Sequence, residues 1–316
     1  MFNNKRIDLK YIVEEYTSVA EKFVANYRLS GTRVFHSNDR QSVLSDTALQ
    51  ACVIATPTNT HEALILASLE AGKAVFCEKP LANSVEAIAK CYDEAHKRNL
   101  QLMCSFNRRF DPGFREIYNR AKAGELGQVQ MAKQTSRDYP LSSMEYFRNT
   151  KGIYHDCAVH NIDLVTRIFG ERPRTVYTTA HAFIKEIGEM NDVDTVAICL
   201  KFPSGGIGLI DISRYACFGY DQRLEVFGDQ GMLTEQNYRA TNVTFSGQDG
   251  ATTGRIYDSF ADRYAESYVK ALDHFVDVVQ GKCVAEITKE STLLVSEIVD
   301  ACDKSLATGQ PVTLPE

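Results

Sequence analysis

Over the first third of the chain, short apolar runs alternate with longer stretches in which apolar residues recur at helical spacing. The runs predict strands over 9–13, 32–35, 51–55, 73–77 and 100–106, and the stretches between them predict helices over 17–27, 43–45, 60–71 and 84–98. The run 51–55 contains no polar residue, which is typical of a central strand in a parallel sheet. Gly72 stands where a glycine that caps the helix 60–71 belongs. This alternation predicts a doubly wound parallel sheet.

Beyond Phe106 the pattern changes, because most strand-like runs follow one another without a helix between them. They predict strands over 128–137, 174–184, 193–202, 206–214, 221–228 and 240–246, with helices over 112–123, 156–169, 259–280 and 286–307. The Pro-Ser-Gly-Gly segment 203–206 predicts a hairpin turn, and strands joined in this way form an antiparallel sheet. The sequence therefore predicts an α/β domain over 1–106 and an α+β domain with a large, mainly antiparallel sheet over 107–316.

The composition restricts the classes of partner and compartment. A length of 316 residues is sufficient for two domains that each bury a core. The net charge of −6 argues against nucleic acid or an anionic membrane surface as a partner, and no apolar run is long enough to cross a membrane. The N-terminal residues lack the apolar core of a signal peptide. Nine cysteines without a C-x-x-C pair indicate reduced thiols and hence a cytoplasmic protein.

Glu14, which follows the first predicted strand, is a candidate cofactor-binding residue. In a dinucleotide-binding fold, an acid at this position hydrogen-bonds the adenosine ribose hydroxyls and repels the 2′-phosphate of NADP, so it favours NAD. A solvated acid in a loop is the alternative interpretation.

Two polar segments follow the third and fourth predicted strands, where open α/β sheets bind their ligands. The first is Ala-Thr-Pro-Thr-Asn-Thr-His at 55–61, which offers the candidate cofactor contacts Thr56, Pro57, Thr58, Asn59 and His61. Thr60 can also be a helix N-cap. The second is Cys-Glu-Lys-Pro at 77–80, which offers Glu78 and Lys79. A lysine that a cofactor desolvates can transfer protons, whereas a lone lysine in a turn is usually solvated.

The predicted helix 156–169 carries a polar stripe among apolar residues. Asp156 and His160 are four residues apart and Asp163 lies one turn further, so the three side chains share one face of a helix. Buried polar groups cost free energy unless they are paired or used, and a histidine oriented by a carboxylate is suited to general base catalysis. A surface ion pair and a metal site are the alternatives. Because the sequence names no clear third ligand, no metal is expected.

Together these motifs resemble the glucose–fructose oxidoreductase and inositol dehydrogenase family (Gfo/Idh/MocA). The resemblance covers nearly the whole chain and rests on A-T-P-T-x-x-H at 55–61, E-K-P at 78–80 and D-x-x-x-H at 156–160, in this order and spacing. Asn-Arg-Arg-Phe-Asp at 107–111 and Gly-Glu-Leu-Gly at 124–127 are also similar to family segments. Within the family, the segment 152–163 is most similar to the inositol dehydrogenases.

The resemblance implies a Rossmann-type domain over 1–106 that binds NAD, with NADP less favoured, and a domain over 107–316 for substrate binding and oligomerisation. It implies hydride transfer between the nicotinamide and a secondary hydroxyl of an inositol-like cyclic polyol or sugar. The catalytic residues would be Lys79, Asp156 and His160: His160 takes the hydroxyl proton, Asp156 orients the substrate and His160, and Lys79 binds the reacting oxygen. The polyol-binding residues would be Asn107, Arg108, Asp163, Tyr220 and Tyr264.

One feature departs from the family pattern. The family begins with a strand and a G-x-G-x-x-G turn that holds the cofactor pyrophosphate, whereas the first glycine of this chain is Gly31. Without that strand, its neighbours in the sheet are expected to have unpaired backbone groups. A truncated start is the simplest interpretation.

Two other functions remain open at this point. One is a catalytically silent relative that acts as a binding or regulatory module, which the missing turn favours and the retained Lys79, Asp156 and His160 oppose. The other is a lyase-type relative that uses NAD transiently.

A homo-oligomer, as a dimer or tetramer, is also expected. An open antiparallel sheet presents one face to solvent, and apolar strand faces favour association with a second copy. The residues that indicate such a face are Val193, Val196, Ile198, Leu200, Ile207, Leu209 and Ile212.

Overall fold

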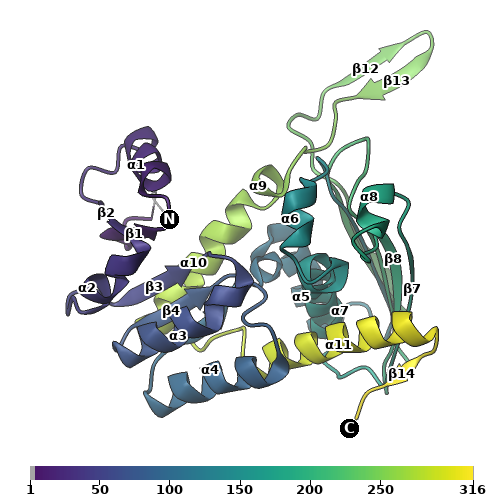
Figure 1. The fold of residues 1–316 in the computed structure, drawn as a ribbon. Coiled ribbons are helices and arrows are strands. Elements are labelled where there is room, and N and C mark those ends of the chain that lie inside the picture. Colours follow the sequence, from purple (N-terminus) through teal and green to yellow (C-terminus); the bar gives the residue numbers. More distant parts are fainter. Residues whose placement is uncertain (1–3, 316) are drawn as a thin grey trace. The chain divides into compact units, whose positions relative to one another are not determined.

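The computed structural model describes residues 4–315, which form two compact units (Figure 1). The first unit contains the chain up to Ser105 together with Leu272–Lys289, and the second contains Phe106–Ala271 and the residues from Glu290 onward. Each unit has its own sheets and its own buried core. Within residues 4–315, no helix has the length and apolar character needed to span a bilayer.

The strands of the first unit form two parallel sheets. One pairs β1 (Tyr11–Glu14) with β2 (Arg33–His36), and the other contains β3 (Ala51–Ile54), β4 (Ala74–Cys77) and β5 (Leu102–Cys104) in that order. The predicted parallel, Rossmann-type arrangement is confirmed. The prediction that 51–55 is a central strand is wrong for the described sheet, because β3 lies at its edge. The central strand is β4, which is apolar and buried throughout.

Within residues 4–315, the edge strands of these two sheets have no further strand partner, and this includes β1 and β3. There β1 pairs only with β2, and β3 pairs only with β4. Val13 of β1 and Val53 of β3 are 37% and 45% exposed, although valine usually faces a core. Open neighbouring edges of this kind are what the departure from the family pattern led us to expect.

Helices connect these strands, and α3 ends at the predicted glycine. They are α1 (Thr17–Asn26), α2 (Arg40–Leu44), α3 (His61–Glu70) and α4 (Val85–Lys97). The Ser84 hydroxyl caps α4 by accepting a hydrogen bond from the backbone N–H of Ala87 at 3.2 Å. Gly72 follows α3 with a φ of +75°, a conformation that glycine adopts without a Cβ clash.

A seven-stranded sheet is the framework of the second unit (Figure 1). Its strands, in sheet order, are β11 (Gly231–Glu235), β10 (Asp221–Gly228), β6 (Val129–Arg137), β9 (Ile207–Ser213), β8 (Thr195–Lys201), β7 (Thr175–His181) and β14 (Val312–Thr313). All neighbours are antiparallel except β6 and β9, so the predicted, mainly antiparallel sheet is confirmed. The predicted turn at 203–206 joins β8 and β9 as a hairpin.

The region after β11 differs from its prediction. The strand predicted over 240–246 is only partly present, as β12 (Thr244–Gly247), which forms a separate exposed hairpin with β13 (Gly250–Thr253). The strand β11 was not predicted because a single two-residue turn separates it from β10.

Alternate residues of the central strands fill the core of the second unit. The side chains of Val196, Ile198, Leu200 and Ile212 are at most 3% exposed. The expectation that they contribute to an exposed association face is therefore wrong. Ile207 and Leu209 alternate with the buried positions of β9 and are only half-buried.

The helices of the second unit are α5 (Pro112–Lys122), α6 (Met144–Arg148), α7 (Val159–Phe169), α8 (Lys185–Gly188), α9 (Phe260–Arg263) and α11 (Lys289–Thr308), and α10 (Ala265–Val279) runs into the first unit. The helix predicted over 259–280 is divided at Tyr264 into α9 and α10. α7 contacts β6 and β9, and its Val165 approaches Gly208 so closely that a Cβ there would lie 2.6 Å away. This close approach seats α7 on the sheet.

Candidate active site

The segment that contains Asp156 and His160 begins with a π-helical turn. This turn spans Tyr154–Ala158, and α7 continues from Val159. The prediction of one regular helix over 156–169 is therefore wrong at its start, and the extra residue per turn changes the direction of Asp156 relative to His160. π-Turns inside helices are frequent at functional sites.

The loop before this turn is held by Asp192. Gly152 has a φ of +87°, and Oδ1 of Asp192 accepts a hydrogen bond from the backbone N–H of Ile153 at 3.2 Å. A Cβ at residue 152 would lie 3.1 Å from the same oxygen. Glycine therefore satisfies both the backbone conformation and the close approach of Asp192.

Both carboxylate oxygens of Asp156 have hydrogen-bond donors. The Tyr146 hydroxyl donates to Oδ1 at 2.8 Å, and Nη1 of Arg214 donates to Oδ2 at 3.1 Å. Burial and the nearby Asp156 raise the pKa of Tyr146, so its hydroxyl keeps the proton that it donates. Arg214 is 1% exposed, and hydrogen bonds from a cation favour the ionised form of a carboxyl group. Asp156 is thus held as an oriented anion.

His160 lies at the start of α7 and is largely buried, with 8% of its surface exposed. The ring of Phe106 meets the imidazole edge-on, with the ring centroids 6.4 Å apart. Because edge-to-face packing restrains both rings, the imidazole plane is defined.

Asp163 forms a buried ion pair with Arg109. Nε of Arg109 donates to Oδ2 of Asp163 at 2.9 Å, and the two side chains are 6% and 1% exposed. Nη2 of Arg109 also donates to Oδ1, so the arginine holds the carboxylate with both arms of its fork. The structure thus gives Asp163 a partner that the sequence did not, and its contact with substrate stays a prediction.

The structure brings together Arg108, Tyr220 and Tyr264. Nη2 of Arg108 lies 3.4 Å from the Tyr220 hydroxyl, and the guanidinium lies 5.0 Å from the centroid of the Tyr264 ring. Burial raises the pKa of Tyr264 to about 12 and also raises that of Tyr220, so both hydroxyls are protonated at neutral pH. Asn107 is connected to Tyr264 through Ser267. Nδ2 of Asn107 donates to Oγ of Ser267, which in turn donates to the Tyr264 carbonyl.

The predicted cofactor residues follow parallel strands of the first unit. Glu14 is the last residue of β1, and its Oε1 accepts a hydrogen bond from the backbone N–H of Tyr16 at 3.1 Å. The segment 56–59 follows β3, and Thr56, Pro57 and Asn59 are exposed while Thr58 is half-buried. Glu78 and Lys79 follow β4 and are half-buried.

His61 joins the two loops that follow β3 and β4. It is 1% exposed, and its ring nitrogens each lie 2.8 Å from a carbonyl oxygen, one of Thr56 and one of Pro80. The imidazole therefore bridges the backbones of the two loops. Its contact with the cofactor stays a prediction. Beside it, burial raises the pKa of the Glu78 carboxyl, which accepts a hydrogen bond from the Ser105 hydroxyl at 3.0 Å.

Comparison with protein families covers both units. The NAD-binding Rossmann fold of an oxidoreductase family matches residues 1–106, and the C-terminal alpha/beta domain of the same family matches residues 120–314. The chain belongs to the Gfo/Idh/MocA oxidoreductase family. The resemblance that the sequence motifs carried is thereby confirmed.

Relatives in this family are similar along most of their length. The myo-inositol 2-dehydrogenase of Thermotoga maritima is 34% identical over 279 residues, which are 88% of this chain and 84% of that protein. The scyllo-inositol 2-dehydrogenase (NAD(+)) of Bacillus subtilis is 31% identical over 281 residues, 88% of this chain and 81% of that protein. The crystal structure of a myo-inositol dehydrogenase from Corynebacterium glutamicum has a TM-score of 0.91 at 30% identity and covers 100% of this chain and 93% of that one.

The Rossmann unit of this Gfo/Idh/MocA chain matches an NAD-binding fold and carries polar residues after its parallel strands. Its parallel strands β1, β3 and β4 all lead into polar residues, at the sheet edge where such folds bind ligands. Thr56, Pro57 and Asn59 are exposed, and the contacts of these residues and of Glu14 with the cofactor stay predictions.

Sequence patterns did not reveal the residues that hold Asp156. Arg214 directly follows β9 and is 58 positions from Asp156, and Tyr146 lies in a short helix ten positions before it. An arginine after a strand is usually exposed. No local signal distinguishes Arg214, because only the packing of β9 beside the π-turn buries it.

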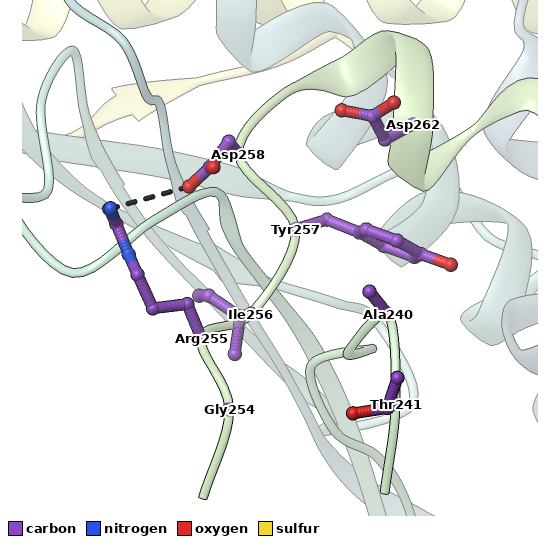
Figure 2. A pocket seen from close by; sticks show the side chains of 8 residues that line it. All are labelled: Ala240, Thr241, Gly254, Arg255, Ile256, Tyr257, Asp258 and Asp262. Carbon is purple, nitrogen blue, oxygen red and sulfur yellow. Dashed lines mark ion pairs between the residues drawn. The ribbon is translucent and has the colours of Figure 1, made fainter.

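A cavity of about 410 Å³ lies elsewhere in the second unit (Figure 2). It is lined by Ala240, Thr241, Gly254, Arg255, Ile256, Tyr257, Asp258 and Asp262, beside the β12–β13 hairpin. Arg255 and Asp258 form an ion pair at 3.3 Å on its rim. None of the predicted site residues lines this cavity.

A separate cluster contains His155, Asp300 and Asp303, whose potential ligand atoms lie within 4.8 Å of one another. Nε2 of His155 is 2.8 Å from Oδ2 of Asp303, a distance that an ion pair explains. Asp156 and His160, for which a metal site was one alternative interpretation of the sequence, do not belong to this cluster. That Asp156 and His160 bind no metal stays a prediction.

Proposed function

We propose that this chain is an NAD-dependent dehydrogenase that oxidises a secondary hydroxyl of an inositol-like cyclic polyol. The observation that carries the proposal is the Asp156 carboxylate, held as an anion by Arg214 and Tyr146, with His160 four residues later. Membership of the Gfo/Idh/MocA family supports it, as do the names of the relatives from T. maritima and B. subtilis.

Each catalytic residue has a distinct role in this proposal. His160 accepts the proton of the reacting hydroxyl, Asp156 orients the imidazole and the substrate, and Lys79 binds the reacting oxygen and assists the proton transfer. NAD, when bound, supplies the hydride acceptor. Because the chain's residues move only a proton, the neutral form of His160 is the active form in the direction of oxidation.

The polyol-binding residues are proposed to be Asn107, Arg108, Asp163, Tyr220 and Tyr264. A cyclic polyol presents many hydroxyls and needs several convergent donors and acceptors. Arg108 and the two protonated tyrosines offer donors, and burial gives them fixed positions. Such a set suits a neutral, hydroxyl-rich ligand better than a cation.

The proposal assigns the cofactor to residues 1–106 and the substrate to residues 107–316. The cofactor contacts are Glu14, Thr56, Pro57, Thr58, Asn59, His61, Glu78 and Lys79. The acid at Glu14 supports NAD over NADP, because it would repel a 2′-phosphate.

A cytoplasmic location and a homo-oligomeric state complete the proposal. Nine free thiols support the reducing compartment. The half-buried apolar residues Ile207 and Leu209 of the large sheet support association with a second copy.

The direct experiment is to follow NADH formation by absorbance with NAD⁺ and either myo-inositol or scyllo-inositol. The proposal expects turnover with at least one of these polyols and loss of about 10²–10⁴-fold in kcat for His160→Asn, as removal of a general base produces. Absence of NADH with every cyclic polyol would show that the proposed reaction is wrong.

A further inference from the structure

The carboxylate of Asp156 is held by a set of residues that no sequence motif contains. Tyr146 donates to one oxygen at 2.8 Å and Arg214 to the other at 3.1 Å. A carboxylate with a donor on each oxygen has one preferred rotation. What fixes Arg214 therefore also fixes Asp156.

Arg214 is itself held by several contacts. Its Nη2 donates to Oδ2 of Asp192 at 3.0 Å, its guanidinium stacks over the Phe147 ring at 4.4 Å, and its backbone N–H donates to the Asp194 carbonyl at 2.8 Å. The side chain is 1% exposed. Burial lowers the pKa of Arg214, but Cys157, Asp156 and Asp192 raise it more, so the net pKa is raised and the group stays charged.

Asp192 extends this network to the backbone in front of the π-turn. Its Oδ1 accepts hydrogen bonds from the backbone N–H groups of Ile153 at 3.2 Å and Val193 at 2.8 Å. Through Asp192, Arg214 therefore connects the Asp156 side chain with the residue before the π-turn and with the loop before β8.

A second acid, Asp138, interacts electrostatically with both Asp156 and Arg214. Burial raises the pKa of Asp138, and the charge of Asp156 raises it further, while Arg108 and Arg214 lower it. The Cys157 thiol lies between the two acids, 3.6 Å from Asp138 and 3.9 Å from Asp156. Without Arg214, only the Arg108 cation would remain to offset the repulsion between the carboxylates of Asp138 and Asp156.

We propose that Arg214 is a positioning residue that fixes the orientation and the negative charge of Asp156 by clamping it to Asp192. In this proposal Arg214 acts on the reaction only through Asp156. The consequence for catalysis rests on the proposed function, whereas the effect on Asp156 does not.

The test compares Arg214→Met and Arg214→Lys with a control, Arg172→Met. Arg172 is half-buried and pairs with Glu297 at 2.6 Å, so the control also removes an arginine from an ion pair of the second unit. The first readout is the pH titration of the Asp156 carboxyl carbon by NMR, assigned with Asp156→Asn. The second is the dependence of kcat/KM on pH.

In Arg214→Met, the titration midpoint of Asp156 should move to higher pH by about one unit or more, as loss of an adjacent cation predicts. kcat/KM should fall by about 10²-fold, as misplacement of a catalytic group predicts. Arg214→Lys should keep Asp156 ionised but still lose about tenfold in kcat/KM, because lysine lacks the two-armed fork. Arg172→Met should leave both readouts at their wild-type values.

A folded Arg214→Met protein whose Asp156 titrates as in wild type would overturn the proposal. If that variant does not fold, a folded Arg214→Lys protein with wild-type kcat/KM would overturn it. A wild-type protein without NAD-dependent activity would refute the proposed function alone, because the Asp156 titration needs no substrate.

Discussion

At the scale of single residues, the buried pair of Arg109 and Asp163 permits a clear prediction about stability. Asp163→Asn should reduce the free energy of unfolding by roughly 3–5 kcal/mol, because it leaves a buried guanidinium without its counter-ion. Urea denaturation measures this loss. The control is Asp211→Asn, which breaks the more exposed pair with Arg137 and should cost less than about 1 kcal/mol. Equal effects of the two substitutions would contradict the structural role of Asp163.

Glu78 predicts how stability depends on pH. Burial raises the pKa of this carboxyl in the folded state, so the folded protein binds the proton more tightly than the unfolded chain does. Its contribution to stability is therefore present at low pH and is lost as pH rises above the unfolded value near 4.3. Relative to wild type, Glu78→Gln should therefore become more stable in denaturation experiments as pH rises above about 4.3. A difference between the two proteins that does not vary with pH would exclude this role.

Glu14 predicts cofactor preference. Glu14→Ala should relax discrimination against NADP⁺, because the carboxylate that repels the 2′-phosphate is removed. Fluorescence titration of each cofactor measures the ratio of the two dissociation constants, and Glu15→Ala, one residue beyond the strand, is the matched control. If the ratio changes only in Glu15→Ala, then Glu15 and not Glu14 determines the cofactor preference.

At the scale of elements, the segment before α7 contains a glycine with a positive φ, Gly152, next to the proposed catalytic residues. Gly152→Ala should cost about 1–2 kcal/mol for its positive φ and should also lower kcat, because the new Cβ displaces Asp192. Gly309→Ala is the matched control, since Gly309 has a φ of +66° and open space around it. It should lose similar stability in thermal denaturation and keep wild-type kcat. Unchanged kcat in Gly152→Ala would mean that the loop does not position the site.

Elements with strong local signals could be predicted from the sequence. Gly72 and Ser84 fixed the end of α3 and the start of α4 because each acts through the backbone next to it. The π-turn at Tyr154–Ala158 could not be predicted, because it depends on contacts with Asp192 and Arg214 that are distant in the sequence. The apolar residues of β8 were expected on the exposed face of the sheet but lie on its buried face. Alternation shows which residues share a face and does not show which face the rest of the chain covers.

At the scale of the whole molecule, the order of motifs carried the family assignment. The catalytic candidates Lys79, Asp156 and His160 follow from that order, whereas their supports Tyr146, Asp192 and Arg214 follow only from the fold. The first unit matches the NAD-binding Rossmann fold, and the edges of its sheets at β1 and β3 are open in the described residues. A tightly bound cofactor would stabilise this unit by mass action.

In the proposed reaction, hydride passes from a polyol carbon to NAD⁺ while His160 takes the proton. The most direct measurement uses myo-inositol that carries deuterium on its ring carbons, with mass spectrometry of the NADH formed. The account predicts one deuterium in the reduced nicotinamide with wild type and greatly reduced formation of labelled cofactor with His160→Asn. Reduced cofactor without deuterium, or none at all with any cyclic polyol, would contradict it.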